Sequence, residues 1–499
     1  MRILNQQLSF LGTRVNALYF NDSHGQTKYI DTFCDEQDKF YKSHPAELNV
    51  TLSGGDVFLD KNKKNETVAQ RLLNRVDAIG VGNHDIEAGS YFNGLIEKFN
   101  LKNKFLSANM NYGENSSYDK NIAKSMVIDK NGDRIGVIGI SPLDFNNLAF
   151  LNATSCNLKV QDFEQTKESI KEEVKKLEAN KIDKIFLLAH TGEHSKNKEK
   201  YYEEFASIGG IDVIIGGHDH REVNKWAVSD RNEPVRIVAT GKTSSHGFGE
   251  NLDYIGELEL DFDEKGVLNP INCKNNLIKL ENKLGGNEKE LVKVLSTPTK
   301  QGDVMKGHSE IANIVADSNL WYVNKHTKGK KADFAFVNAG TIRANFDDKN
   351  ISNDDIEAVV PFVTSTLIKT SLNKKQVQET LSWCAKSTGF SRIAPGIMHV
   401  SSLEYDVNPD LSVDNIKLLN DDGSVKCRLD ECSDDKEFTV VIDKFLATGT
   451  LGLVHLKKDC VNDSNVECFQ ASRQDALLGY LKQEDVLKDY KAERIHLKY

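Results

Sequence analysis

The first half of this 499-residue chain alternates apolar, β-branched runs with charged stretches that favour helices. The runs with the length and composition of buried strands are Val15–Phe20, Leu48–Leu52, Ala78–Gly82, Arg134–Ile140, Lys184–Ala189, Val213–Gly216 and Val235–Thr240. Between two of these runs, Gln161–Asn180 has the charge and spacing of an amphipathic helix. This alternation is typical of an α/β domain.

Residues that bind metals follow several of these runs at the point where each run ends. The segments are Asn21-Asp22-Ser23-His24-Gly25, Ser53-Gly54-Gly55-Asp56, Gly82-Asn83-His84-Asp85, His190 and Gly217-His218-Asp219-His220. One such histidine or Gly-Asp pair is usually an ordinary turn, but the repetition at successive strand ends is hard to assign to chance. In open α/β sheets, strand ends converge on one crevice, and sites are built there.

Together these segments supply two carboxylates, one amide and four imidazoles as candidate ligands. That set is large enough to hold two divalent metal ions. Its ligand atoms are oxygen and nitrogen, with no thiolate, which suits Mn or Zn and argues against Cu(I) or an iron–sulfur cluster. The sequence therefore predicts a dinuclear metal centre.

The chain is too long for one ordinary core, and about 150 residues per domain gives two or three domains. A Lys- and Asn-rich stretch around Cys273–Glu290 looks like a boundary, and Ser309–Asn324 has helical spacing. A second mixed α/β pattern follows. We expect a first domain over residues 1–285, a linker and interdomain helix over 286–325, and a second domain over 326–499.

Composition excludes several classes of protein. Hydrophobic residues make up 39% and charged residues 28% of the chain, as in soluble globular proteins. A net charge of -10 disfavours a nucleic-acid duplex as partner. No apolar run reaches the length of about 18 residues that a transmembrane helix needs. The N-terminus has no signal-peptide pattern, so a cytoplasmic location and loss of an export signal both stay open.

Four of the eight cysteines, Cys427, Cys432, Cys460 and Cys468, lie close together near the C-terminus. One or two disulfides and ordinary reduced thiols are both compatible with this pattern. None of the spacings is that of a metal knuckle. The sequence says nothing of the oligomeric state.

The order of the strand-end motifs resembles that of the calcineurin-like metallophosphoesterases. In the C-terminal half, Asn338–Arg343 reads NAGTIR and resembles the N-x-G-x-(I/V)-R element of the 5′-nucleotidase family. Val360-Pro361-Phe362 and Phe445–Gly449 are similar to two later segments of that family. The resemblance covers nearly the whole chain. It implies a four-layer αββα metallophosphoesterase domain followed by a mixed α/β domain that binds the substrate.

The resemblance also implies that the strand-end residues form two ligand sets that share one carboxylate. One set is Asp22, His24 and His220, the other is Asn83, His190 and His218, and Asp56 bridges the two ions. A bridging carboxylate holds two ions about 4 Å apart, so that they can share the water that attacks phosphorus.

His84 adjoins a ligand but is not one in the family, where it stabilises the transition-state oxygen or protonates the leaving group. An Asp three residues later usually orients that histidine, and here the equivalent position is Glu87. The longer side chain can still pair with His84, but it changes the geometry of the dyad. A purely structural imidazole is the alternative.

Substrate contacts are implied by four residues of the second domain: Arg343, Phe390, Arg392 and Leu453. Arg343 matches the phosphate-side arginine of the family, since a planar guanidinium suits an oxyanion; an interdomain ion pair is the alternative. Relatives stack the base between two rings. Here Phe390 is displaced by one residue in its loop, Leu453 replaces the second ring, and Thr364 stands where an Asn is usual.

Three functions follow, and all bind a small phosphoester or a molecule like it. The first is a 5′-nucleotidase that releases phosphate from nucleoside monophosphates. The second keeps the chemistry but acts on a 2′,3′-cyclic nucleotide, a nucleotide sugar or a non-nucleotide phosphoester. The third is a binding protein without turnover, which the complete set of ligand residues argues against. In the family the two domains rotate to bring substrate to the metals, and we expect a hinge near Ser309–Asn324.

Overall fold

The computed structural model describes residues 12–27, 29–87, 89–113, 116, 118, 120–130, 132–145, 158–193, 200–241, 254–280, 291–294, 304–346, 350–388, 396–449, 451–458, 463, 465–483 and 493–498. These residues fall into two compact units, called unit 1 and unit 2 below. Unit 1 contains the described residues up to Leu280, and unit 2 contains those from Leu291 onward. Among the described residues, none of the helices combines the length and the apolar composition that a membrane span requires.

Unit 1 is built on two sheets whose central strands are parallel. The first sheet has the order β15 (Lys274–Lys279), β14 (Tyr254–Phe262), β1 (Thr13–Phe20), β2 (Leu48–Ser53), β3 (Ala78–Gly80), β4 (Phe105–Leu106), β6 (Ile122–Ala123). The second has the order β12 (Val223–Val228), β13 (Pro234–Ala239), β11 (Val213–Gly216), β10 (Ile185–Ala189), β8 (Asp133–Ile140), β7 (Ser125–Lys130). Strands β1, β2 and β3 run parallel, as do β8, β10, β11 and β13.

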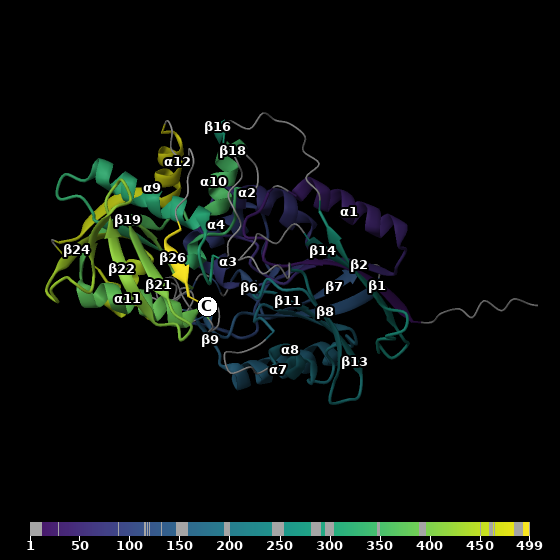
Figure 1. Ribbon diagram of the computed structural model, residues 1–499. Helices are drawn as coiled ribbons and strands as arrows, with labels where there is room; N and C mark the ends of the chain where they lie inside the picture. The colour runs from purple at the N-terminus through teal and green to yellow at the C-terminus, as the bar shows by residue number, and fades with distance from the viewer. Residues whose placement is uncertain are drawn as a thin grey trace, which may run out of the picture. The chain divides into compact units, whose positions relative to one another are not determined.

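The two sheets pack face to face, with helices on their outer faces (Figure 1). Val15 and Ala17 of β1 share a core with Phe186 and Leu188 of β10, so this core lies between the sheets. The helices of unit 1 are α1 (Ile30–Ser43), α2 (Lys64–Thr67), α3 (Asn83–Glu87), α4 (Ser90–Lys98), α7 (Phe163–Ala179) and α8 (Tyr201–Ala206). Helices α1 and α4 cover the first sheet, and α7 and α8 cover the second. The predicted four-layer αββα domain is confirmed.

Each strand and helix expected in the first half is present. The apolar runs became β1, β2, β3, β8, β10, β11 and β13, and the helix expected over Gln161–Asn180 is α7. Its N-terminus carries a capping box, in which Asp162 accepts from the Gln165 amide and Gln165 accepts from the Asp162 amide. Such caps satisfy amide groups that have no partner within the helix. A further short pair joins β5 (Met110–Tyr112) to β9 (Leu158–Val160).

The polar stretch around Cys273–Glu290 is not a plain boundary, because its first part is strand β15. This strand pairs antiparallel with β14 at the edge of the first sheet. An edge strand with exposed side chains needs few apolar residues, which explains the Lys and Asn content. Residues 281–290 lie outside the described residues.

The described residues of unit 2 form a five-stranded sheet, a four-stranded sheet and a two-stranded pair. The five-stranded sheet has the order β20 (Met398–Ser401), β17 (Phe334–Asn338), β24 (Glu437–Asp443), β19 (Thr366–Asn373), β25 (Glu467–Ser472). The four-stranded sheet has the order β23 (Val425–Arg428), β22 (Val413–Leu419), β21 (Leu403–Val407), β26 (Ile495–Leu497), and β16 (Leu291–Val294) pairs with β18 (Asn350–Ser352). The helices are α9 (Glu310–His326), α10 (Asn353–Val359), α11 (Lys374–Ser387) and α12 (Arg473–Leu481).

Alternation along β17 shows how the helices cover its sheet. Phe334 and Phe336 pack with the face of α11 that carries Leu381, whereas Ala335 packs with Val323 of α9. The helix expected over Ser309–Asn324 is α9, and its contacts place it in unit 2. The mixed α/β architecture expected for the C-terminal half is confirmed.

The C-terminal cysteines do not form one group. Cys468 is disulfide-bonded, whereas Cys427 and Cys432 are free thiols. Cys460 lies outside the described residues.

Candidate metal centre

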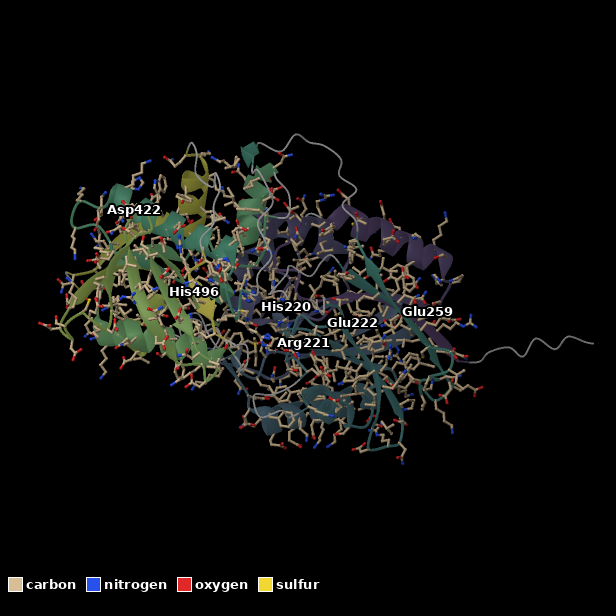
Figure 2. All side chains as sticks on the ribbon, in the orientation of Figure 1. His220, Arg221, Glu222, Glu259, Asp422 and His496 are labelled. Atoms are coloured by element: carbon tan, nitrogen blue, oxygen red, sulfur yellow. The ribbon has the colours of Figure 1, made fainter. Side chains whose placement is uncertain are left out.

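The candidate ligands lie at the carboxyl ends of strands from both sheets of unit 1. Asp22 and His24 follow β1, Asp56 follows β2 and Asn83 follows β3, while His190 follows β10 and His218 and His220 follow β11. Figure 2 labels His220 in the loop after β11, with Arg221 and Glu222 next to it. A side chain at Gly54 would place its Cβ 2.3 Å from the Gly216 carbonyl, so only glycine lets the two strand ends approach this closely. The crevice is thus shared by two facing sheets, which the single-sheet argument from sequence did not anticipate.

The side chains of these loops converge in overlapping trios. In each trio the candidate ligand atoms lie within 4.8 Å of one another. The trios are Asp22, His24 and His220; His24, Asp56 and His84; and Asp56, His190 and His218. Asp56 and His24 each belong to two trios, so the groups form one continuous cluster.

Asn83 supplies a further observation that fits a metal. Its side-chain Oδ1 is buried, and within the described part of the chain it has no hydrogen-bond partner. A buried amide oxygen without a partner costs about 1–3 kcal/mol, and a cation would remove that cost. The residues present therefore fit divalent ions.

His190 is fully buried, and its two ring nitrogens have different surroundings. Nδ1 lies 2.7 Å from the Gly54 carbonyl, so this nitrogen carries the proton and donates it there. Nε2 lies 3.0 Å from Asp56 and 3.7 Å from Asp22. Burial lowers the pKa of His190, but Asp56 and Asp22 raise it, to about 9. Nε2 therefore holds a proton at the place where a cation would sit.

Asp22, Asp56 and His24 have the protonation states that metal binding requires. Burial would raise the pKa of Asp22, but His220 and His190 hold it well below its ordinary value. The pKa of Asp56 is likewise lowered, by His190 and His84 acting against burial. Burial lowers the pKa of His24 to about 3, which leaves its imidazole neutral with a free lone pair. Ionised carboxylates and a neutral imidazole are the ligand forms that bind divalent ions.

The backbone at the cluster adopts a conformation that side chains disfavour. The φ angle is 55° at Asp22, 46° at His24, 53° at Asp56, 80° at His218 and 48° at His220. Left-handed backbone at a non-glycine residue costs about 1–3 kcal/mol and persists where the surroundings enforce it. Such strain gathers at functional sites, and here it occurs at five of the candidate ligands.

Asp85 holds the loops together, although the sequence assigned it no role. Its carboxylate accepts hydrogen bonds from the amides of Asp56 at 3.0 Å, Val57 at 2.9 Å and Gly82 at 2.9 Å. A Cβ at Gly82 would lie 1.9 Å from Asp56 Oδ1, so this close approach requires glycine. The sequence contained an indication of this role, because Asp85 is the last residue of the Gly82–Asp85 segment.

Two further residues flank the cluster. Asn21 donates to Asp22 Oδ2 at 2.6 Å and to the Thr240 carbonyl at 2.9 Å, which orients the Asp22 carboxylate. Asp144 Oδ1 lies 3.7 Å from His218 Nε2. Asp144 comes shortly after β8, so applying the strand-end rule to Arg134–Ile140 would have found it.

His84, a member of one trio, lies at the start of α3. Its amide donates to Asp56 Oδ1 at 2.8 Å, and its ring centroid is 4.9 Å from that of His24. The structure therefore brings the imidazole to the candidate ligands. The side chain of Glu87, its expected partner, lies outside the described residues.

The expected substrate residues of unit 2 have different surroundings. Arg343 is half-buried, and its guanidinium lies 5.1 Å from the centroid of the Phe362 ring. Leu453, expected where relatives place the second ring, is fully buried in a hydrophobic core. The turn around it directs the side chain inward, which is favourable for leucine. Phe390 and Arg392 lie outside the described residues.

Comparison with known proteins adds to this geometry. Residues 16–222 match the calcineurin-like phosphoesterase family, and residues 291–458 match the 5′-nucleotidase C-terminal domain. The chain is 27% identical to the 5′-nucleotidase of Homo sapiens over 434 residues, covering 77% of this chain and 71% of that protein. It is 25% identical to the trifunctional nucleotide phosphoesterase protein YfkN of Bacillus subtilis over 450 residues, covering 78% of this chain but only 29% of that protein.

Solved structures share the fold. The 5′-nucleotidase precursor from Thermus thermophilus aligns with a TM-score of 0.74 at 19% identity, covering 97% of this chain and 99% of that one. The sulfate thiohydrolase SoxB of the same species aligns with a TM-score of 0.62 at 14% identity, covering 97% of this chain and 96% of that one.

Proposed function

The chain belongs to the 5′-nucleotidase family, with a calcineurin-like phosphoesterase domain before a 5′-nucleotidase C-terminal domain, and we propose that it releases phosphate from nucleoside 5′-monophosphates. Members of this family are metal-dependent phosphoester hydrolases, and so is this chain. The observation that carries the proposal is the cluster of overlapping trios around Asp56. The substrate class rests on the relatives and on residues of unit 2.

The residues of the cluster divide into two ligand sets in this proposal. Asp22, His24 and His220 would hold one ion, Asn83, His190 and His218 would hold the other, and Asp56 would serve both. The trios contain both sets except Asn83, whose buried Oδ1 supports its inclusion. When bound, the ions polarise the phosphoryl oxygens and activate the attacking water. Nitrogen and oxygen ligands favour Mn or Zn.

The protein's own groups orient the ions and the substrate. Asp85 fixes the loops that carry Asp56 and Asn83, and Asn21 fixes Asp22. His84 donates a proton or a hydrogen bond to the phosphoryl oxygen or to the leaving group. Two observations support this role: its ring lies beside that of His24, and its backbone amide donates a hydrogen bond to Asp56 Oδ1. Such a group contributes about 10²–10⁴-fold to turnover.

The two parts of the chain divide the work in this proposal. Residues 1–285 hold the metals, residues 286–325 include α9, and residues 326–499 bind the substrate. Arg343 contacts an anionic oxygen of the substrate, because its guanidinium is partly exposed and held against Phe362. A planar guanidinium can make two parallel hydrogen bonds to a phosphate.

A second substrate class is favoured by one observation. Leu453 is buried, so it gives no face for a base. One stacked ring is worth about 1–3 kcal/mol, which is about one to two orders of magnitude in affinity. A 2′,3′-cyclic nucleotide, a nucleotide sugar or a non-nucleotide phosphoester would depend less on a second ring.

Product formation from a panel of phosphoesters tests the proposal. The panel contains nucleoside 5′-monophosphates, 2′,3′-cyclic nucleotides, nucleotide sugars and p-nitrophenyl phosphate, with Mn or Zn supplied and with chelator as control. We expect chelator-sensitive phosphate release that is fastest for nucleoside 5′-monophosphates. Hydrolysis of p-nitrophenyl phosphate alone would contradict the substrate, and turnover in excess chelator would contradict the mechanism.

A further inference from the structure

A buried ion pair lies at the carboxyl ends of two parallel strands in unit 2. Strand β24 ends at Asp443, and the neighbouring strand β17 ends at Asn338. Arg473, the first residue of α12, places its Nη1 2.9 Å from Asp443 Oδ2. The side chains of Arg473 and Asp443 are each only 3% exposed. An arginine this deeply buried is unusual unless it is paired and serves a purpose beyond packing.

The pair is tied to the turn that carries Arg343. Arg473 Nη1 also donates to the Thr341 hydroxyl, and that hydroxyl donates to Asn338 Oδ1 at 2.7 Å. Asn338 and Thr341 both belong to the NAGTIR segment that ends in Arg343. These hydrogen bonds therefore hold the short helical turn Ala339–Thr341 in place.

The carboxylate of the pair is anchored independently. Asp443 Oδ2 accepts from the Ser365 hydroxyl at 2.7 Å, and Oδ1 accepts from the Leu446 amide at 3.0 Å. The Ser365 hydroxyl in turn accepts from the Phe445 amide at 3.2 Å. These hydrogen bonds hold the Asp443 carboxylate in place. Arg473 contacts both Asp443 and Thr341, so it holds the Thr341 side chain in a defined position relative to Asp443.

The Phe362 ring lies near both Arg473, which is buried, and Arg343, which is half-buried. Its centroid lies 5.1 Å from the Arg343 guanidinium carbon and 6.0 Å from that of Arg473. The Arg343 amide also donates to the Val359 carbonyl at 2.9 Å, which fixes the backbone of this residue. Both guanidiniums are therefore attracted to one ring, and the guanidinium of Arg343 is held against it.

Charge and stability considerations favour a role in positioning. Desolvating an ion pair usually offsets its attraction, so apolar residues would stabilise this position as well or better. The two guanidiniums beside Phe362 bring positive charge into a region of low dielectric. That charge favours an anion at the more exposed member, Arg343.

We propose that Arg473 is a positioning residue that holds Arg343, through Thr341 and Phe362, in the orientation that binds an anionic phosphate group of the substrate. The proposal rests on the proposed function, in which Arg343 makes that contact. Arg473 does not touch the substrate, and acts by fixing the turn beneath it.

The test compares Arg473→Lys with Arg343→Ala and the double variant, with 5′-AMP as substrate and inorganic phosphate as competing ligand. Lysine keeps a charge near Asp443, but its ammonium ends one bond short of the Nη1 atom that contacts both Asp443 and Thr341, so it cannot hold both contacts at the same geometry. We expect Arg473→Lys to raise KM for 5′-AMP and the inhibition constant of phosphate about tenfold, with kcat and metal content unchanged. In the double variant, Arg473→Lys should not raise KM beyond the value of Arg343→Ala alone, because the side chain that Arg473 positions is already absent.

Two further variants separate positioning from folding. Thr341→Val keeps the ion pair and the side-chain volume but removes the hydroxyl, and it should raise KM in the same direction. Arg494→Lys weakens another Arg–Asp pair of unit 2, in which Arg494 lies 2.7 Å from Asp317, and it should lower thermal stability without changing KM.

Specific results would overturn the proposal. It fails if Arg473→Lys lowers the melting temperature like Arg494→Lys and leaves KM unchanged, or if its effect multiplies with that of Arg343→Ala. If Arg343→Ala itself leaves KM and phosphate inhibition unchanged, the Arg343 contact of the proposed function fails together with this proposal. If only Arg343→Ala raises KM, that contact stands and the role of Arg473 is wrong.

Discussion

The charged clusters of the two units differ in the kind of partner that neutralises each carboxylate. In unit 1, histidines are the basic side chains next to Asp22 and Asp56, and an imidazole is charged only when protonated. In unit 2, Asp443 is paired with Arg473, whose guanidinium keeps its charge at every physiological pH. The first cluster can exchange protons for divalent cations, and the second cannot.

The backbone conformation also differs between the two clusters. The metal-centre loops of unit 1 contain left-handed residues with side chains, including Asp22 and His218. At the network of unit 2, Asn338 has an ordinary extended conformation with a φ of -72°. The loops of unit 1 thus hold strained backbone at the candidate ligands, whereas the turn that begins at Asn338 does not. In the proposed function, the first cluster holds an exchangeable cation and the second positions a guanidinium for an anion.

Replacing the shared ligand should have the largest effect. Asp56→Ala removes the carboxylate common to two trios, so we expect loss of both metals and of turnover down to the level of the chelated protein. Metal analysis and phosphate release measure this. Asp212→Asn is the matched control, because Asp212 is a buried carboxylate that accepts the Ile185 amide outside the cluster. Retained metal and turnover in Asp56→Ala would contradict the comparison.

His84→Ala separates chemistry from metal binding within unit 1. We expect both metals to stay and kcat to fall about 10²–10⁴-fold, because a proton donor is lost. Metal content and the pH profile of kcat are the measurements. A variant that loses its metals would show that His84 is a ligand, as its trio with His24 and Asp56 allows.

Arg343→Ala tests the guanidinium of unit 2 that is proposed to bind the substrate phosphate. A charge-assisted hydrogen bond is worth about 1.5–3 kcal/mol, so KM for 5′-AMP should rise about 10–100-fold. Metal content should be unchanged, since no ligand is altered. Steady-state kinetics measure KM, and metal analysis measures the bound ions. A loss of metal would show that Arg343 also affects the metal centre of unit 1.

The smallest effect concerns acid stability and contrasts two buried histidines. Burial lowers the pKa of His399 in unit 2 to about 4, whereas the pKa of His190 in unit 1 is raised. As pH falls below the ordinary value of 6.5, the unfolded chain binds a proton at His399 before the folded chain does. The stability contribution is therefore complete above pH 6.5 and is lost toward pH 4, by about 1.4 kcal/mol per pH unit.

His399→Gln tests this contrast, because the amide can still donate to the Val304 carbonyl, which His399 contacts at 2.8 Å, but cannot titrate. Its unfolding free energy should depend less steeply on pH between 6.5 and 4 than that of the unchanged protein. Urea unfolding at several pH values measures this slope. An identical slope in both proteins would assign the acid sensitivity to other groups.

Local patterns predicted the strands and the ligand positions, because an apolar run followed by Asp, Asn or His is visible in the sequence. Asp144 and Asp85 also come after strands and could have been singled out, but their partners, His218 and the Asp56 loop, become known only when distant segments fold together. The inward direction of Leu453 likewise depends on the packing of its turn.

Arg473 carries no motif, and only the ends of β17 and β24 bring it to Asp443. The strained backbone at the ligands also has no sequence signal, because Asp and His rarely adopt it. The stretch interpreted as a boundary includes both strand β15 and the division between the two units, because an exposed edge strand can be as polar as a linker.

The most direct test of the dinuclear mechanism is a titration of the chelator-treated protein with Mn or Zn, counting bound ions while measuring phosphate release from 5′-AMP. The two ligand sets that share Asp56 predict two tightly bound ions per chain, with turnover that appears as the second ion binds. Full turnover with one ion bound, or with none, would contradict the account.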